Sequence, residues 1–182
     1  MIDINLIKNN SYSEVVFERT MTTYRGYEGV LKILCYYRDA FEQMKCVIKF
    51  KINGQRSSGE VSIEFSEEKQ NLIIFSNLYV PSSISSKGIG TLLMNEVFEI
   101  ENDIVNYYRL SKNDIVLKGW LSGIDFSNGN WKISLPLYEK IGKMKGYNVI
   151  FKTRNTGKEY TTAADYLKYS NGEDGDIVYT AK

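Results

Sequence analysis

The stretch SSISSKGIGTLLMNEVF, from Ser82 to Phe98, decides most of what this 182-residue sequence predicts. It follows the apolar run LIIFSNLYV (Leu72–Val80) and Pro81, and after Gly90 its apolar residues recur at steps of three and four. An apolar run that ends at a proline is typical of a strand, and the spacing that follows is typical of a helix. The stretch therefore predicts a strand covered on both faces, a serine- and glycine-rich loop, and a long helix.

Patterning on either side of this stretch predicts an α/β (α+β) fold with a mixed, mostly antiparallel central sheet flanked by helices. Alternating or continuous apolar runs indicate strands, and apolar steps of three and four indicate helices. A proline tolerated in a first helical turn places the start of one helix at Ser134. The predicted strands are Glu14–Thr20, Cys46–Ile52, Glu60–Phe65, Ile115–Leu121, Asn148–Thr153 and Asp176–Thr180. Helical patterns are predicted over Met21–Met44, which Gly26 and Gly29 split into a turn and a helix, and over Ser134–Lys145 and Ala163–Tyr169.

Composition excludes several classes of function. The net charge of +1 lacks the electrostatic footprint of a nucleic-acid-binding protein, and no apolar run approaches the length of a membrane span. The N-terminus does not have the basic and then apolar start of a signal peptide, so a cytoplasmic protein is expected. The chain contains no histidine, which excludes Ser-His-Asp and Cys-His catalysis. Cys35 and Cys46 are expected to be reduced and buried, and no metal site is predicted.

The loop before the long helix combines the features of an anion site. The first turn of a helix has N–H groups without intrahelical partners and carries a partial positive charge. Glycine lets an anion approach the backbone, Lys87 adds a cation, and nearby hydroxyls add donors. The spacing matches neither the Walker phosphate loop nor the dinucleotide fingerprint. Two interpretations therefore remain open: the glycines hold a phosphate, or they serve only turn geometry and packing.

The surroundings of the loop resemble the GNAT superfamily of N-acetyltransferases. The segment Ser85-Ser86-Lys87-Gly88-Ile89-Gly90 is similar to that family's Gln/Arg-x-x-Gly-x-Gly/Ala motif, and Tyr138-Glu139-Lys140-Ile141-Gly142 is similar to its Tyr-Glu-Lys-x-Gly stretch. The order of the predicted elements also agrees from about Cys46 to Thr153. The resemblance implies a single domain: an N-terminal layer of strand and helices (1–45), a coenzyme A-binding core (46–153), and a polar loop with a last strand (154–182).

The resemblance also implies an activity, a co-substrate and a set of site residues. The activity is transfer of an acetyl group from acetyl-CoA to a primary amine of a small molecule or peptide, without a metal. Tyr138 is expected to be the acid that protonates the departing thiolate. The expected cofactor-binding residues are the end of the central strand, Leu78, Tyr79 and Val80, and the loop residues Ser85, Ser86, Lys87, Gly88, Ile89, Gly90 and Thr91.

The sequence leaves the general base, the acceptor site and the retention of catalysis open. Asp125, Glu60 and Glu64 are candidate bases, and a chain of waters is the alternative. Tyrosine-rich segments at 22–45 and 155–175 are candidates for an acceptor pocket or a partner surface, including that of a homodimer. Ser85 stands where the family has Gln or Arg. This difference motivates the alternative of a non-catalytic CoA-binding or protein-interaction module on the same fold.

Overall fold

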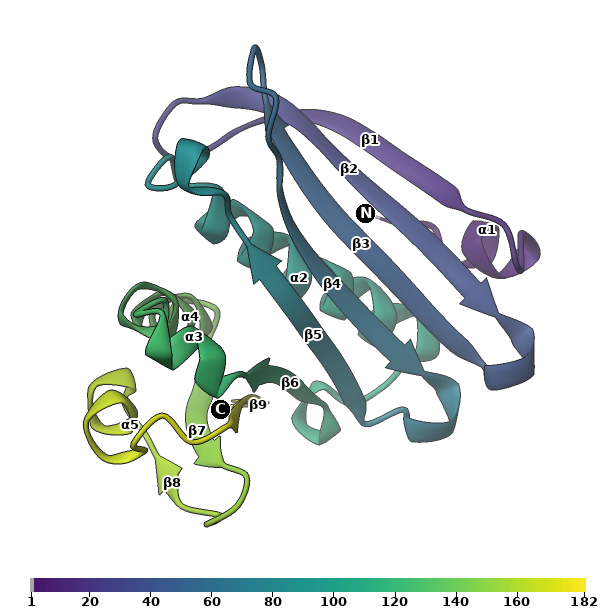
Figure 1. Ribbon diagram of the computed structural model, residues 1–182. Coiled ribbons are helices and arrows are strands. Elements are labelled where there is room, and N and C mark those ends of the chain that lie inside the picture. The colour runs from purple at the N-terminus through teal and green to yellow at the C-terminus, as the bar shows by residue number, and fades with distance from the viewer. Residues whose placement is uncertain (1) are drawn as a thin grey trace. The chain divides into compact units, whose positions relative to one another are not determined.

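The computed structural model describes residues 2–182, which form two compact units: unit 1, up to Leu110, and unit 2, Ser111–Lys182 (Figure 1). The predicted fold class, α+β with mixed, mostly antiparallel β-structure and flanking helices, is confirmed. The elements of unit 1 are α1 (Ile4–Asn9), β1 (Val15–Thr22), β2 (Glu28–Arg38), β3 (Gln43–Ile52), β4 (Gly59–Ser66), β5 (Leu72–Tyr79) and α2 (Ile89–Tyr108). Those of unit 2 are β6 (Val116–Leu121), α3 (Gly123–Ser127), α4 (Trp131–Met144), β7 (Tyr147–Thr153), β8 (Glu159–Tyr160), α5 (Ala163–Tyr169) and β9 (Gly175–Ala181).

Unit 1 is an antiparallel sheet with strand order β1-β2-β3-β4-β5 and with α2 along one face (Figure 1). Alternate residues of β2, β3 and β4 are buried, as expected for a sheet with one covered face. The apolar stripe of α2 includes Leu93, Val97, Ile100 and Ile104, none of which is exposed. These residues and the inward-facing residues of the strands form the core of unit 1.

The beginning of α2 lies very close to the beginning of β4. A Cβ atom at Gly59 would lie 2.6 Å from Ile89 Cγ2 and 3.2 Å from Leu93 Cδ1, so no larger residue fits at position 59 without displacement. Because glycine has no Cβ, the first turn of the helix can rest directly on the strand. This contact fixes the position of the helix start and of the loop that leads into it.

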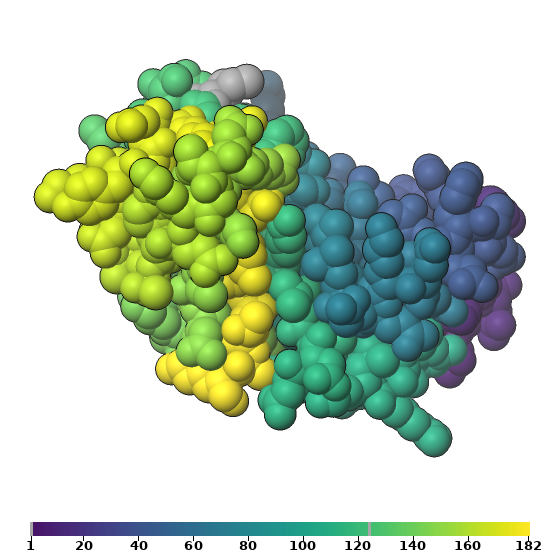
Figure 2. All heavy atoms as spheres, turned by 90° about the horizontal axis from the view of Figure 1, so that it is seen from below, coloured from purple at the N-terminus to yellow at the C-terminus, as the bar shows by residue number. Residues whose placement is uncertain are grey.

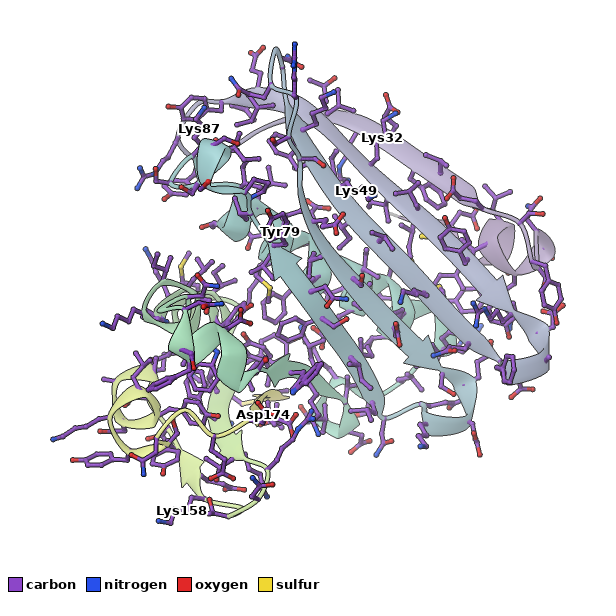
Figure 3. All side chains as sticks on the ribbon, viewed as in Figure 1. Lys32, Lys49, Tyr79, Lys87, Lys158 and Asp174 are labelled. Carbon is purple, nitrogen blue, oxygen red and sulfur yellow. The ribbon has the colours of Figure 1, made fainter. Side chains whose placement is uncertain are left out.

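The other face of the sheet carries charged residues in register across the strands. Lys32 of β2 lies opposite Lys49 of β3. Each lysine pairs with a glutamate on its other neighbouring strand: Lys32 with Glu18 of β1 at 2.7 Å, and Lys49 with Glu60 of β4 at 3.6 Å. Figure 3 shows these two lysines on the sheet together with Tyr79 of β5, which lies opposite Glu60 of β4. Exposed pairs of this kind contribute little to stability, but they keep this face polar.

The predicted helix in Met21–Met44 is wrong, because this segment forms the end of β1, the β1–β2 turn, the whole of β2 and the start of β3. Leu31, Leu34 and Tyr37 have helical spacing, but they are part of an alternation in which Leu31, Ile33 and Tyr37 are buried on one face. The β-branched and aromatic residues of the segment also favour strands. Leu34 is on the opposite, half-buried face, so the apparent helical spacing combined residues from both faces of a strand.

Smaller differences concern the boundaries and the exposure of other elements. The strand β5 is covered on one face only, and Ile74 on its other face is 39% exposed. Helix α4 begins at Trp131 and not at Ser134, which places Pro136 inside it. Helices α1 and α3 were not predicted, whereas the predicted α5 agrees with the structure.

Unit 2 is an antiparallel sheet with strand order β6-β9-β7-β8, packed with helices α4 and α5. In Figure 2 its C-terminal residues (yellow) form a band beside the light green residues of the same unit. Its core is aromatic: the rings of Trp131, Phe151 and Tyr160 all lie within 5.6 Å of the Tyr166 ring, centre to centre, and Tyr166 is fully buried. The other tryptophan, Trp120 of β6, is exposed.

The two cysteines lie opposite each other in unit 1. Cys35 of β2 and Cys46 of β3 are cross-strand partners, and both are free and fully buried on the covered face of the sheet. Burial raises the pKa of the Cys46 thiol well above its ordinary value, so this thiol stays protonated. The prediction of two reduced, buried cysteines is confirmed.

A single carboxylate ties the N-terminal helix to the sheet and to the end of α2. Glu67 Oε1, in the turn after β4, accepts hydrogen bonds from Lys8 Nζ at 2.7 Å, Tyr37 OH at 2.7 Å and Tyr108 OH at 2.6 Å. Burial alone would raise the pKa of Glu67, but the hydrogen bonds from Lys8, Tyr108 and Tyr37 outweigh it and hold the pKa below its ordinary value. Four elements of unit 1 therefore share one charge-dependent junction.

We expect Glu67→Gln to lower the free energy of unfolding at pH 7 by about 1–3 kcal/mol, because the variant loses charge-assisted hydrogen bonds. A carboxyl with a lowered folded-state pKa stabilises above its unfolded-state pKa of about 4.3, and this contribution is lost as the pH falls through the folded-state pKa. The difference between wild type and variant should therefore shrink below about pH 4. Urea unfolding followed by circular dichroism measures it.

The matched control is Glu68→Gln, which changes the exposed neighbouring acid. Equal stabilities of the two variants at pH 7 would show that the junction does not stabilise the unit.

Candidate functional site

The end of β5 contains a β-bulge. Ser76 pairs with Ser62, but Tyr79 pairs with Glu60, so three residue steps on β5 face two on β4. Asn77 has a φ of 57°, in the left-handed region that few non-glycine residues adopt. A bulge leaves its extra residue out of the hydrogen-bond ladder, and bulges are frequent next to active sites. The predicted cofactor-binding residues Leu78, Tyr79 and Val80 thus follow the point where the regular ladder of this strand is interrupted.

Two more left-handed residues lie in the loop between β5 and α2. Ser86 has a φ of 59° and Gly88 a φ of 84°, and Gly88 occupies the position just before the helix. A left-handed serine stores backbone strain, which often marks a functional loop. Ser85 Oγ is engaged within the loop, since it donates to the Ser82 carbonyl at 2.9 Å.

The first turn of α2 presents backbone donors. No side chain caps it, and the first intrahelical bond runs from Leu92 N–H to the Gly88 carbonyl at 3.1 Å. The N–H groups of Ile89, Gly90 and Thr91 precede this bond and have no intrahelical acceptor. Ile89 itself is a core residue, packed against Gly59. The loop can therefore offer its backbone to an anion, while its side chains hold the helix in place.

Gly88 has structural reasons to be glycine in addition to any role in binding. Its φ of 84° is strained for other residues, and a Cβ atom there would lie 2.7 Å from Tyr24 Cε1. The turn between β1 and β2 thus rests on the loop. Both interpretations of the glycine motif remain compatible with this geometry, since turn geometry and phosphate access both require glycine at position 88.

A groove lies between the end of β1 and the first turns of α2. Its volume is about 270 Å³, and it is lined by residues 21–24 and by Thr91, Leu92, Asn95 and Glu96. Glu96 is buried and forms an ion pair with Arg19 of β1. Of the predicted cofactor-binding residues, Thr91 lines this groove. The groove therefore adjoins the predicted anion site.

Tyr138, the predicted acid, belongs to α4 of unit 2. It is 8% exposed, and its backbone carbonyl accepts a hydrogen bond from Tyr179 OH at 3.2 Å. Burial, with a smaller contribution from the charge of Asp125, raises the pKa of Tyr138 above its ordinary value. The phenol is therefore neutral and protonated at pH 7, but it is a weaker acid than an exposed tyrosine.

The rest of the Tyr-Glu-Lys-x-Gly stretch is explained by packing within unit 2. Glu139 accepts the Ala163 N–H at 2.7 Å and pairs with Lys143, so it holds the start of α5. A Cβ atom at Gly142 would meet the Tyr179 ring and would lie 2.8 Å from Val149 Cγ2. Helix α4 can approach β7 and β9 this closely only because position 142 is glycine.

The three candidate bases lie in different surroundings. Glu60 and Glu64 are on the charged face of the unit 1 sheet, paired with Lys49 and Lys45. Asp125 is in α3 and accepts a hydrogen bond from Asn130 at 3.2 Å. Glu60 is the cross-strand partner of Tyr79, and so it is the candidate beside the bulge.

The acidic residues of the segment before and in β9 are engaged in the structure of unit 2. Glu173 accepts the N–H groups of Asn155 and Thr156, and Asp174 accepts the Gly123 N–H. Three other acids of this part of unit 2 also have partners: Glu159 pairs with Lys152, Asp165 with Thr162, and Asp176 with Arg154 and Lys118. These acids therefore hold the loops of unit 2 together.

The predicted cofactor-binding residues all lie in one stretch of unit 1, from the bulge of β5 to the first turn of α2. Tyr138 lies in the other unit. Sequence reasoning missed the bulge at Asn77 and the contact of the β1–β2 turn with the loop. Asn77 carried a weak signal, because asparagine is among the residues most often found at positive φ. The contact between the β1–β2 turn and the loop carried no sequence signal, because it joins residues more than sixty positions apart.

No family model, curated protein or solved structure matches this chain in comparisons with known proteins. In residues 2–182, no helix is both long and apolar enough to cross a membrane. The described side chains also include no group of three or more Cys, Asp and Glu placed to hold a metal ion.

We expect Gly142→Ala to destabilise the protein by about 1–3 kcal/mol, because the added methyl group overpacks the contact with Tyr179. Without this contact the same substitution would stabilise a helix by up to about 1 kcal/mol. The sign of the change in unfolding free energy therefore shows whether the close contact exists. Thermal unfolding measures it. Lys140→Ala on the exposed side of the same helix is the control and should change stability by less than about 0.5 kcal/mol. A stabilising Gly142→Ala would contradict the close helix–sheet packing.

Proposed function

We propose that this protein is an acetyl-CoA-dependent N-acetyltransferase that acetylates a primary amine of a small molecule or peptide. The observation that carries the proposal is the segment of unit 1 from Asn77 to Thr91. Within it, an interrupted strand, a strained loop and an uncapped helix start follow one another, with left-handed residues at 77, 86 and 88. The likeness of its sequence to the GNAT motif gives this geometry a chemical interpretation.

In this proposal the backbone of the segment does most of the binding. The N–H groups of Gly88, Ile89, Gly90 and Thr91 hold the pyrophosphate, and Lys87 adds a positive charge. The bulged end of β5 supplies a backbone N–H to the thioester carbonyl, which becomes negative as the amine attacks. Acetyl-CoA supplies the activated acetyl group.

Proton transfers complete the reaction. The amine nitrogen attacks the carbonyl carbon, a C–N bond forms and the C–S bond breaks. Glu60, or a water that it orients, takes the proton that the amine gives up. The phenol of Tyr138 gives its proton to the thiolate. The outcome is an amide and free coenzyme A.

A second candidate function is a module that binds coenzyme A without turnover. The burial of Tyr138 favours it, because a raised phenol pKa makes proton donation to a thiolate less favourable. Ser85, in place of a long side chain, is also consistent with it.

We expect acetyl-CoA, but not ATP, to raise the melting temperature. At about 100 times its dissociation constant a ligand adds roughly 2.7 kcal/mol, or about 5 to 10 °C for a protein of this size. Gly90→Val should abolish the shift, because its side chain would stand between the first-turn N–H groups and the pyrophosphate. Asn106→Val, at an exposed position near the other end of α2, is the control. No shift with the wild-type protein would contradict CoA binding.

We expect Tyr138→Phe to lower kcat by about 10²- to 10⁴-fold while leaving acetyl-CoA binding intact, because it removes only the proton donor. Mass spectrometry of acetylated spermidine and lysine-containing peptides measures turnover. Tyr169→Phe changes an exposed tyrosine of the same unit and is the control. Full turnover in Tyr138→Phe would remove the acid role. Binding of acetyl-CoA without turnover of any of these amines would favour the second candidate function.

A further inference from the structure

The turn between β1 and β2 is ordered and rests on the loop before α2. Thr23 N–H donates to the Tyr27 carbonyl at 2.9 Å, and Gly26 N–H donates to the Thr23 carbonyl at 2.9 Å. Tyr24 packs on Gly88, as described above. The side chains of this turn are therefore held next to the predicted pyrophosphate loop, although they are more than sixty residues away in sequence.

Two cations lie over aromatic rings at this contact. The Arg25 guanidinium is 5.5 Å from the centre of the Tyr24 ring, and its Nε donates to Tyr24 OH at 2.9 Å. Lys87 Nζ is 5.2 Å from the centre of the Tyr27 ring. Figure 3 shows Lys87 at the end of the sheet where this turn lies. Across residues 2–182, no ion pair of the structure uses Arg25 or Lys87.

Two acids beside the turn, Glu96 and Glu28, form no ion pair with Arg25 or Lys87 within the described residues 2–182. Glu96, in the groove beside the turn, is already paired with Arg19. Glu28 lies at the base of the turn, opposite Thr22, where it is exposed to solvent. The turn and the loop thus present two available cations, which suits a ligand with a phosphate group.

The adjoining groove suits a flat heteroaromatic ring. Its walls combine apolar side chains, Met21 and Leu92, with the amide of Asn95 and the hydroxyl of Thr91. Ligand sites commonly have apolar walls and a few polar groups, and the volume of about 270 Å³ is just below their usual range, which suits one ring system of a ligand. An asparagine amide can pair with the donor–acceptor edge of adenine, and a tyrosine ring such as that of Tyr24 can stack on it.

The geometry points to the β1–β2 turn as the part of the protein that recognises the adenosine 3′-phosphate end of coenzyme A. Arg25 binds the 3′-phosphate, Tyr24 stacks on the adenine, and Asn95 reads its edge, while Lys87 remains with the pyrophosphate. This inference rests on the proposed function, and it names the residues that select the nucleotide end of the same ligand. Tyr24, Arg25 and Asn95 are not part of the glycine motif.

The test compares coenzyme A with dephospho-coenzyme A, which lacks only the 3′-phosphate, by isothermal titration calorimetry. We expect the wild-type protein to bind coenzyme A at least about tenfold more tightly. Arg25→Ala should raise the dissociation constant of coenzyme A by about tenfold and change that of dephospho-coenzyme A by less than about threefold. Asn95→Leu should weaken both ligands alike. Arg38→Ala, at the other end of β2, should change neither, and equal melting temperatures confirm that the variants are folded.

Each outcome has one interpretation. Loss of the preference for the 3′-phosphate in Arg25→Ala, but not in Arg38→Ala, supports the assignment. Equal affinities of the wild-type protein for the two ligands, or an unchanged preference in Arg25→Ala, overturn it and leave the proposed function standing. Absence of binding by either ligand overturns both.

Discussion

The close approach of Ile89 to Gly59 is the constraint on which the arrangement of unit 1 depends. It places the start of α2 on β4 without an intervening side chain, and the apolar stripe of the helix then follows the covered face of the sheet. The loop before the helix has a second close contact, because Gly88 lies against Tyr24 of the β1–β2 turn. The packing that builds the core therefore also sets the geometry of the candidate site.

The candidate site is built more from backbone than from side chains. Its distinguishing features are the bulge at Asn77, the left-handed residues Ser86 and Gly88, and the uncapped N–H groups of α2. Each has a cost in conformational energy, and packing of the surrounding core offsets it. Unit 2 shows the opposite balance: Glu139 and Gly142 of its motif-like stretch serve its own packing. The proposal of an acetyltransferase rests accordingly on unit 1.

Local patterns predicted the elements that are defined by local periodicity. The α2 stripe, the strands β3 and β4, and the short helix α5 could be inferred because burial follows sequence spacing there. The β1–β2 hairpin could not, since Leu31, Leu34 and Tyr37 have the three-residue spacing of a helix although Leu34 lies on the opposite face of the strand from the other two. The bulge and the turn–loop contact depend on pairing across strands and on residues distant in sequence, so they leave little trace in any short window. The glycine motif indicated the candidate site, but not the contact of the β1–β2 turn with its loop.

The distribution of two rare residue types allows the two units to be observed independently. Both cysteines, Cys35 and Cys46, are fully buried in unit 1, and both tryptophans, Trp120 and Trp131, belong to unit 2. The rate at which a thiol reagent modifies the protein therefore reports the opening of the first unit, and tryptophan fluorescence reports the unfolding of the second. The native chain thus carries a separate probe in each of its two units, so whether the units unfold together can be measured without any engineered label.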